Sequence, residues 1–568
     1  MTDEQTVEGG LAEPEELEPE QGSLRLAAPE DRRDRAQGRA EWEAAAAAVL
    51  RRARRLGDDE PDALVWEKLT LTTLDGIGVS PLGTPELLDD LTTSGRPSRA
   101  GAWDVRAHLL VTDARADNET LLADLEGGAT SLWLRVPEDT DFAVLLDRVL
   151  LDLAPVVLET TEAGARAFLR HAEGRDLEPR TNLGLDAAAA GPEPAELARR
   201  AGIRAYVVDA AALHDRGASD VQELAHSLAV GAAYLRRLSE AEVGVDEAAR
   251  LVEFRYAATA EQLPTIAKLR AARRLWARVL ELSDAQDRAQ HQHAVTSRAM
   301  LSKYDPWVNM LRTTVAAFAA GVGGADAVTV LPFDTPLGTP DAFGRRIARN
   351  TSHLLIEESH VAVVSDPAGG AYAVEKLTED LAVAAWELFG RLEEGADLEE
   401  EIAGTVARRD RDVATRRRPI TGLSEFPNLA EELPVRPPAP EDEVRRYGAA
   451  FESLRDDPAE EPVLLAPLGT VAQHTARATF ATNLLAAGGI GVVEAAGSDR
   501  APRPPRVACI VGTDAAYDEE GAARAAALRE AGAEWVVVAG RPREWADDSC
   551  ALGVDALDFL RRTREKLR

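Results

Sequence analysis

The hydrophobic pattern between residues 105 and 335 alternates between two periods. Short β-branched runs are followed, in nearly every case, by stretches with apolar residues at helical spacing, as in Val221–Leu238 and Pro264–Leu282. The eight runs are Val105–Val111, Ser131–Val136, Val156–Thr160, Asn182–Asp186, Ala205–Asp209, Glu253–Ala257, His293–Ser297 and Ala327–Pro332. Alternating strands and helices predict a parallel sheet, and eight such units predict an α/β fold closed into a (β/α)8 TIM barrel.

The last hundred residues repeat the alternation on a smaller scale. Four apolar runs are separated by helical stretches such as Gly521–Ala531. The runs are Val463–Leu468, Gly491–Glu494, Val507–Val511 and Trp535–Ala539. This pattern predicts a second, flavodoxin-like doubly wound domain after the barrel.

Composition shifts suggest five segments along the chain. They are an acidic tail at 1–40, a helical segment at 41–104, the barrel with a C-terminal helical layer at 105–417, a Pro/Glu-rich linker at 418–462, and the doubly wound domain at 463–568. The tail has too few apolar residues to fold alone. A free tail and a tail that wraps around a partner both remain open.

The net charge of −33 limits the partners that the chain can have. A protein this acidic repels nucleic acid and anionic lipid, so neither is expected. The sequence contains no apolar run of membrane-spanning length, and its first 21 residues have eight acids and no Lys or Arg, unlike a signal peptide. The two cysteines, Cys509 and Cys550, are expected to be reduced core residues of a cytoplasmic protein.

His474 attracts attention because it follows an apolar run and precedes a helical pattern. A histidine in such a strand-to-helix loop can present a ring nitrogen to a metal or cofactor if a carboxylate fixes its tautomer. Here Ala472 stands where that carboxylate would help, and Arg477 stands where a small residue would leave room. We therefore expect no metal site at His474.

Five motifs occur in order along the chain. They are Trp66-Glu67-Lys68-Leu69-Thr70, Leu74-Asp75-Gly76-Ile77, Pro264 to Trp276, Asp305-Pro306-Trp307-Val308-Asn309 through Thr314, and Ile347-Ala348-Arg349-Asn350-Thr351 with the later Asp366-Pro367 and Gly369-Gly370-Ala371-Tyr372. In this order and spacing they resemble the methylmalonyl-CoA mutase family of adenosylcobalamin enzymes. The resemblance spans nearly the whole chain and implies a barrel followed by a cobalamin-binding domain.

The departures from the family pattern fall on its catalytic residues. Catalytic members end the fifth barrel strand in a Tyr-His pair that lies against the substrate, and Ala211 and Ala212 occupy those positions here. Alanine supplies neither a hydrogen-bond donor nor an aromatic wall. His214 lies two residues further on and is expected to be a loop or helix-start residue. After the seventh strand, Arg298 replaces a family glycine.

The cobalamin signature of the family, Asp-x-His-x-x-Gly, is also degenerate. His474 matches the cobalt-ligand histidine, but Ala472 and Arg477 replace the aspartate and glycine. We therefore expect no catalytic residues in this chain and no cofactor bound by its degenerate cobalamin domain. Arg255, Lys268 and Arg270 have the chemistry to contact a phosphate, although ion pairs are the favoured interpretation for all three.

The resemblance therefore points to the small, or beta, non-catalytic chains of the family. It implies a heterodimer with a catalytic large, or alpha, subunit that binds adenosylcobalamin and interconverts (R)-methylmalonyl-CoA and succinyl-CoA. This chain would then belong to an isomerase while being inactive alone. The alternative is a mutase-derived regulatory or scaffold protein that binds CoA esters without turnover.

Overall fold

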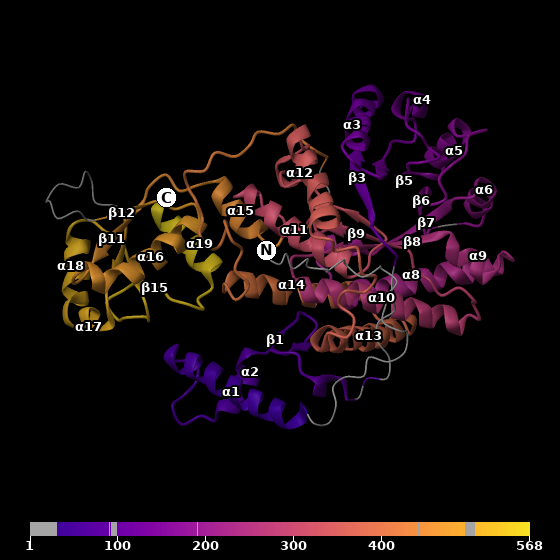
Figure 1. The fold of residues 1–568 in the computed structure, drawn as a ribbon. Helices are drawn as coiled ribbons and strands as arrows, with labels where there is room; N and C mark the ends of the chain where they lie inside the picture. The colour runs from indigo at the N-terminus through magenta and orange to yellow at the C-terminus, as the bar shows by residue number, and fades with distance from the viewer. Residues whose placement is uncertain (1–30, 90, 92–98, 190, 441–442, 495–505) are drawn as a thin grey trace, which may run out of the picture.

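The computed structural model describes residues 31–89, 91, 99–189, 191–440, 443–494 and 506–568. A closed barrel of eight parallel strands and a smaller five-stranded parallel sheet form two lobes (Figure 1). This confirms the predicted class, a TIM-type barrel followed by a parallel-sheet domain. Among the described helices, none has the length and apolar character needed to cross a membrane.

The barrel strands follow one another around the ring in chain order, and the last strand pairs with the first. The strands are β3 (Asp104–Leu110), β4 (Ser131–Arg135), β5 (Val156–Glu159), β6 (Asn182–Asp186), β7 (Arg204–Asp209), β8 (Val252–Ala258), β9 (Gln292–Thr296) and β10 (Ala327–Thr329). Ala327 pairs with Asp104 in parallel register and closes the ring. Each strand overlaps one of the eight predicted runs.

Several barrel helices begin at polar side chains that cap the first free backbone N–H groups. Asp113 accepts hydrogen bonds at the start of the first helix, and Ser219 and Gln222 form a capping box at the helix Asp220–Glu240. The helices are α3 (Ala114–Glu126), α4 (Phe142–Leu145), α5 (Glu162–His171), α6 (Glu193–Ala201), α7 (Ala210–Asp215), α8 (Asp220–Glu240), α9 (Val245–Arg250), α10 (Gln262–Leu282) and α11 (Pro306–Val322). Because all eight strands are parallel, their carboxyl ends lie at one mouth of the barrel, where a TIM barrel carries its functional residues.

Three further helices follow the barrel. They are α12 (Ala342–His353), which continues into a π-helical turn at Leu354–Glu358, α13 (Tyr372–Glu393) and α14 (Leu398–Ala414). Helix α12 contacts α3 and α11, while α13 lies along α8 and α10. Arg270 of α10 fixes this second contact, because its buried guanidinium donates to Glu375 of α13 at 2.6 Å and also pairs with Asp366.

The segment before the barrel is helical, with α1 (Asp31–Arg52) at its start. This helix includes residues 31–40, which the composition assigned to the tail; they contain no proline and several arginines, and arginine favours helix. Residues 1–30 lie outside the described residues. The remaining elements are α2 (Val65–Leu69), a hairpin of β1 (Leu71–Thr72) and β2 (Gly78–Val79), and 3-10 turns at Asp62–Leu64 and Pro85–Leu88.

The C-terminal lobe is a doubly wound sheet with strand order 2-1-3-4-5, the flavodoxin-like order. Its strands are β11 (Val463–Pro467), β12 (Val492–Glu494), β13 (Val507–Val511), β14 (Trp535–Ala539) and β15 (Asp548–Cys550). Its helices are α15 (Ala449–Asp456), α16 (Val471–Ala487), α17 (Asp514–Ala516), α18 (Ala522–Glu530) and α19 (Ala556–Leu567). The edge strand β15 was not predicted, because its three residues do not form an apolar run.

Candidate functional site

Side chains from opposite walls of the barrel meet on its axis. Arg106 of β3 and Glu253 of β8 form an ion pair at 2.7 Å, with side chains only 2% and 3% exposed. These two strands are not neighbours in the ring, so the pair crosses the interior. Burial by itself would raise the pKa of Glu253, but Arg106 and Arg204 outweigh it and hold this pKa below its ordinary value.

A second group of side chains fills the axis beside this pair. The guanidinium of Arg255 lies 4.0 Å from the ring of Trp133, which in turn meets His293 edge-on at 5.4 Å. The Nδ1 atom of His293 accepts a hydrogen bond from Arg255, so its Nε2 carries the proton and donates to Thr329 at 2.8 Å. Burial, and then Arg106 and Arg255, lower the pKa of His293 well below its ordinary value, which keeps the ring neutral.

Ala211 and Ala212 lie in the first turn of α7, directly beyond the carboxyl end of β7. Together with Arg255 and Arg298 they line a hollow of about 90 Å³. That space corresponds to about three water molecules, which is much less than an acyl-CoA thioester needs. The hollow beside these two alanines is therefore too small for a thioester substrate, and neither alanine supplies a hydrogen-bond donor to it.

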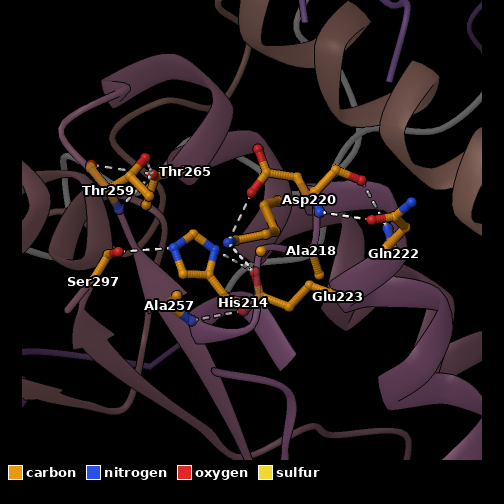
Figure 2. A network of polar contacts seen from close by, with 12 residues as sticks. His214, Ala218, Asp220, Gln222, Glu223, Ala257, Thr259, Thr265 and Ser297 are labelled. Carbon is orange, nitrogen blue, oxygen red and sulfur yellow. Dashed lines mark hydrogen bonds and ion pairs between the residues drawn. The ribbon is translucent and has the colours of Figure 1, made fainter. Parts of the chain in front are cut away.

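His214 lies in the last turn of α7 and is part of a buried polar network (Figure 2). Its Nε2 lies 2.8 Å from the hydroxyl of Ser297 and 3.1 Å from that of Tyr447, and its Nδ1 lies 3.7 Å from Glu223. Burial, followed by the nearby charge of Lys268, lowers the pKa of His214 well below its ordinary value. A neutral histidine with these partners links α7, the end of β9 and the linker, and it also lines a hollow of about 670 Å³.

The three cations with the chemistry to contact a phosphate are all held in ion pairs. Arg255 pairs with Asp209 at 2.6 Å, Lys268 with Glu223 at 2.6 Å and with Asp220 at 2.9 Å, and Arg270 with Glu375 at 2.6 Å. The side chains of Lys268 and Glu223 are fully buried, and Figure 2 shows Asp220 and Glu223 converging on one ammonium group. These contacts favour the ion-pair interpretation over a phosphate site.

His474 is the fourth residue of α16 and does not lie in a loop, contrary to the expectation from its sequence position. Thr470 and Gln473 form a capping box, in which the Gln473 side chain accepts from the Thr470 N–H at 2.7 Å. The box stabilises the first helical turn and so draws His474 into the helix. The Nδ1 atom of His474 is buried and has no hydrogen-bond partner among the described residues, so no carboxylate orients the ring.

Arg477 fills the crevice at the carboxyl ends of the C-terminal strands, where doubly wound sheets hold their ligands. It donates to the Gly512 carbonyl at 2.9 Å and pairs with Asp514 at 2.9 Å. Its guanidinium also lies 4.9 Å over the ring of Tyr517 and would meet any Cβ placed on Gly540 at 3.1 Å. The chain's own side chains thus occupy the position where a ligand would enter.

Of the axial residues of the barrel, Arg255 was singled out from the sequence, but the pair of Arg106 with Glu253 was not predicted. Their signal was the presence of Glu253 and Arg255 at alternate positions of an otherwise apolar strand, all seven residues of which are buried. Alternate positions of a barrel strand face the interior. Two opposite charges with that spacing therefore indicated an interior occupied by side chains.

Comparison with known proteins gives a consistent picture. Residues 200–488 match the family model described as methylmalonyl-CoA mutase. The chain is 44% identical to a protein of Streptomyces virginiae named methylmalonyl-CoA mutase small subunit, across 93% of this chain and 96% of that protein. A protein of Propionibacterium freudenreichii subsp. shermanii with the same name is 35% identical, across 93% and 94%. The protein of Rhizobium meliloti named methylmalonyl-CoA mutase is 36% identical across only 39% of this chain and 33% of its own length.

Proposed function

Because this chain belongs to the methylmalonyl-CoA mutase family, we propose that it is the small, or beta, subunit of a heterodimeric adenosylcobalamin-dependent methylmalonyl-CoA mutase. Its partner is the catalytic large, or alpha, subunit, which binds the cofactor and interconverts (R)-methylmalonyl-CoA and succinyl-CoA. This chain supports the partner and is inactive alone. The proposal is supported by relatives named small subunit that match it along most of its length.

The filled barrel axis carries the proposal of inactivity. The described side chains leave no space for an acyl group along the axis, because Arg106 and Glu253 meet across the interior and Trp133 and Arg255 lie beside them. Arg106 and Arg255 each pair with a carboxylate of this chain, which favours side chains over a ligand along the axis. Ala211 and Ala212 at the mouth are consistent with the same conclusion.

The residues of the C-terminal lobe do not fit cobalamin. A metal-ligating histidine usually has a carboxylate or carbonyl that orients its ring. His474 belongs to α16, Ala472 supplies no carboxylate, and Arg477 is tied down by Asp514 within the crevice. We therefore assign the cofactor to the partner and derive no step of the reaction through this chain.

The test is to purify this chain alone, the large subunit alone, and the two after co-expression. We expect no succinyl-CoA formation and no cobalamin absorbance with this chain alone, and co-elution with activity for the pair. Stoichiometric cobalamin or measurable turnover with this chain alone would overturn the proposal. If the chain did not associate with the large subunit but bound CoA esters without turnover, the scaffold alternative would replace it.

We further propose that the acidic segment before α1 contributes to this association and that the complex is cytoplasmic. The free, buried state of both cysteines supports a reducing compartment. Deleting residues 1–30, which leaves α1 intact, is expected to weaken co-elution with the large subunit. Unchanged affinity after this deletion would remove the tail from the interface.

A further inference from the structure

A large hollow opens beside the filled barrel axis, at the carboxyl ends of β3 and β10. It measures about 1130 Å³ and lies between α3, α12 and the linker. The linker forms part of its outer wall, because the Thr339 N–H donates to the Pro437 carbonyl at 2.8 Å and Arg436 pairs with Asp334. The space is large enough for a ligand of nucleotide size.

The lining of this hollow is basic, although the chain as a whole carries a net charge of −33. Its charged side chains comprise six arginines against three carboxylates. The arginines are Arg135, Arg298, Arg345, Arg346, Arg349 and Arg446. Three of them already have partners outside the lining, Arg135 with Glu159, Arg298 with Asp215 and Arg446 with Glu452. The arginines of α12 are therefore the ones that can attract an anion.

Two of these guanidinium groups share one carboxylate. Arg345 and Arg349, one helical turn apart on α12, both pair with Asp124 of α3, whose side chain is only 3% exposed. One positive charge therefore remains uncompensated at this place. Arg346, between them in sequence, is exposed and makes no ion pair within the described part of the chain; its guanidinium lies 5.5 Å over the ring of Phe343.

His108 of β3 gives separate evidence of positive electrostatic potential in this hollow. Its Nε2 is buried and has no hydrogen-bond partner among the described residues. Burial lowers the pKa of His108 well below its ordinary value, and Arg298, Arg135 and Arg345 lower it further. The principal charges that act on this ring are therefore all positive. An acceptor oxygen beside Nε2 would supply the missing hydrogen-bond partner and place negative charge among these cations.

We propose that this hollow binds a phosphate-bearing small molecule of nucleotide size, with its phosphates held by the α12 arginines. Guanidinium groups recognise phosphate oxygens through paired N–H donors, which a single carboxylate partner does not exhaust. The neutral imidazole of His108 would act as an additional donor or acceptor at the inner end of the hollow. The inference does not depend on the subunit role, because every residue that it uses lies in this chain.

The experiment is calorimetric titration of the full chain with ATP, with inorganic pyrophosphate, and with adenosine. We expect ATP and pyrophosphate to bind and adenosine, which lacks phosphate, not to bind. Arg346→Glu is expected to weaken binding by at least about tenfold, and Arg346→Gln by a smaller factor, because the first reverses a charge that the second only removes. Arg346 is exposed, so both variants are expected to keep the fold, which circular dichroism checks.

Arg52→Glu is the matched control, since it makes the same charge change on an exposed position of α1, away from α12 (Figure 1). It is expected to leave the affinity unchanged. If neither phosphate compound binds at about 1 mM, the proposal is wrong. It is equally wrong if Arg52→Glu weakens binding as much as Arg346→Glu, because the attraction would then be a general effect of net charge.

Discussion

Replacing Lys268 with methionine tests the buried network behind the barrel mouth. The Lys268 ammonium lies 2.6 Å from Glu223, and both side chains are 0% exposed. Methionine has nearly the volume of the lysine stem, so the substitution removes the charge without leaving a large cavity. Glu223 would keep the Ala257 N–H as a donor but would lose its cation.

The expected loss can be bounded from this geometry. At 2.6 Å and an effective dielectric constant of about 20, the Coulomb attraction within the pair is about 6 kcal/mol, part of which offsets the cost of desolvating both groups. Breaking a buried pair from one side typically costs about 3–5 kcal/mol. We expect a loss of this size in urea unfolding at pH 8. Lys303→Met is the control, because Lys303 pairs with Asp456 at the same distance but on the surface, where such a pair contributes about 0.2–1 kcal/mol.

The pH dependence gives the sharper test of the reasoning. Burial already raises the pKa of Glu223 to about 7, and loss of the lysine raises it further. A carboxyl whose folded pKa is raised gives stability that is complete below its unfolded pKa and is lost as pH rises through the folded pKa. The defect of Lys268→Met should therefore shrink at pH 5, and adding Glu223→Gln should restore much of the stability at pH 8. A loss below about 1 kcal/mol, or a defect that grows toward acid pH, would refute the account.

Three further predictions concern other parts of the chain. Restoring the family signature with Ala472→Asp and Arg477→Gly should give no cobalamin absorbance, because the capping box keeps this turn helical; a stoichiometric red complex would contradict this. Burial raises the pKa of Asp75 to about 6, so Asp75→Asn should gain up to about 2 kcal/mol over the wild type in unfolding experiments as pH rises from 4 to 7; no change in this difference with pH would count against it. Gly231→Ala should cost about 1–3 kcal/mol in thermal unfolding, because its Cβ would lie 2.7 Å from an indole ring, whereas Gly244→Ala, with no atom within 4 Å, should cost little.

Most of the fold followed from local patterns in the sequence. The strands of the barrel are short apolar runs bounded by capped helices, so their number and order were readable from periodicity. Strand β15 was missed because its three residues, Asp548–Cys550, depend on pairing with β14 rather than on their own propensity. The start of α1 at Asp31 was also missed, because acidic composition suggested a tail although the local residues favour a helix.

The site was harder to predict because it depends on contacts between distant segments. Ala211 and Ala212 could be assigned from their position after the fifth barrel strand. The pair of Arg106 with Glu253 joins residues far apart in sequence and follows only from closure of the barrel. His474 was placed in a loop because its neighbour Gln473 was not recognised as the second half of a capping box.

The ion pair across the barrel axis has a consequence for how this chain can evolve. A single substitution at Arg106 or Glu253 would strand a buried charge and cost about 3–5 kcal/mol, a large share of the stability of an ordinary domain. Removing the pair without this loss of stability would therefore need changes at both positions at once. The two positions are expected to change only as a unit, with both charges replaced together, so the pair ties the sequence of β3 to that of β8.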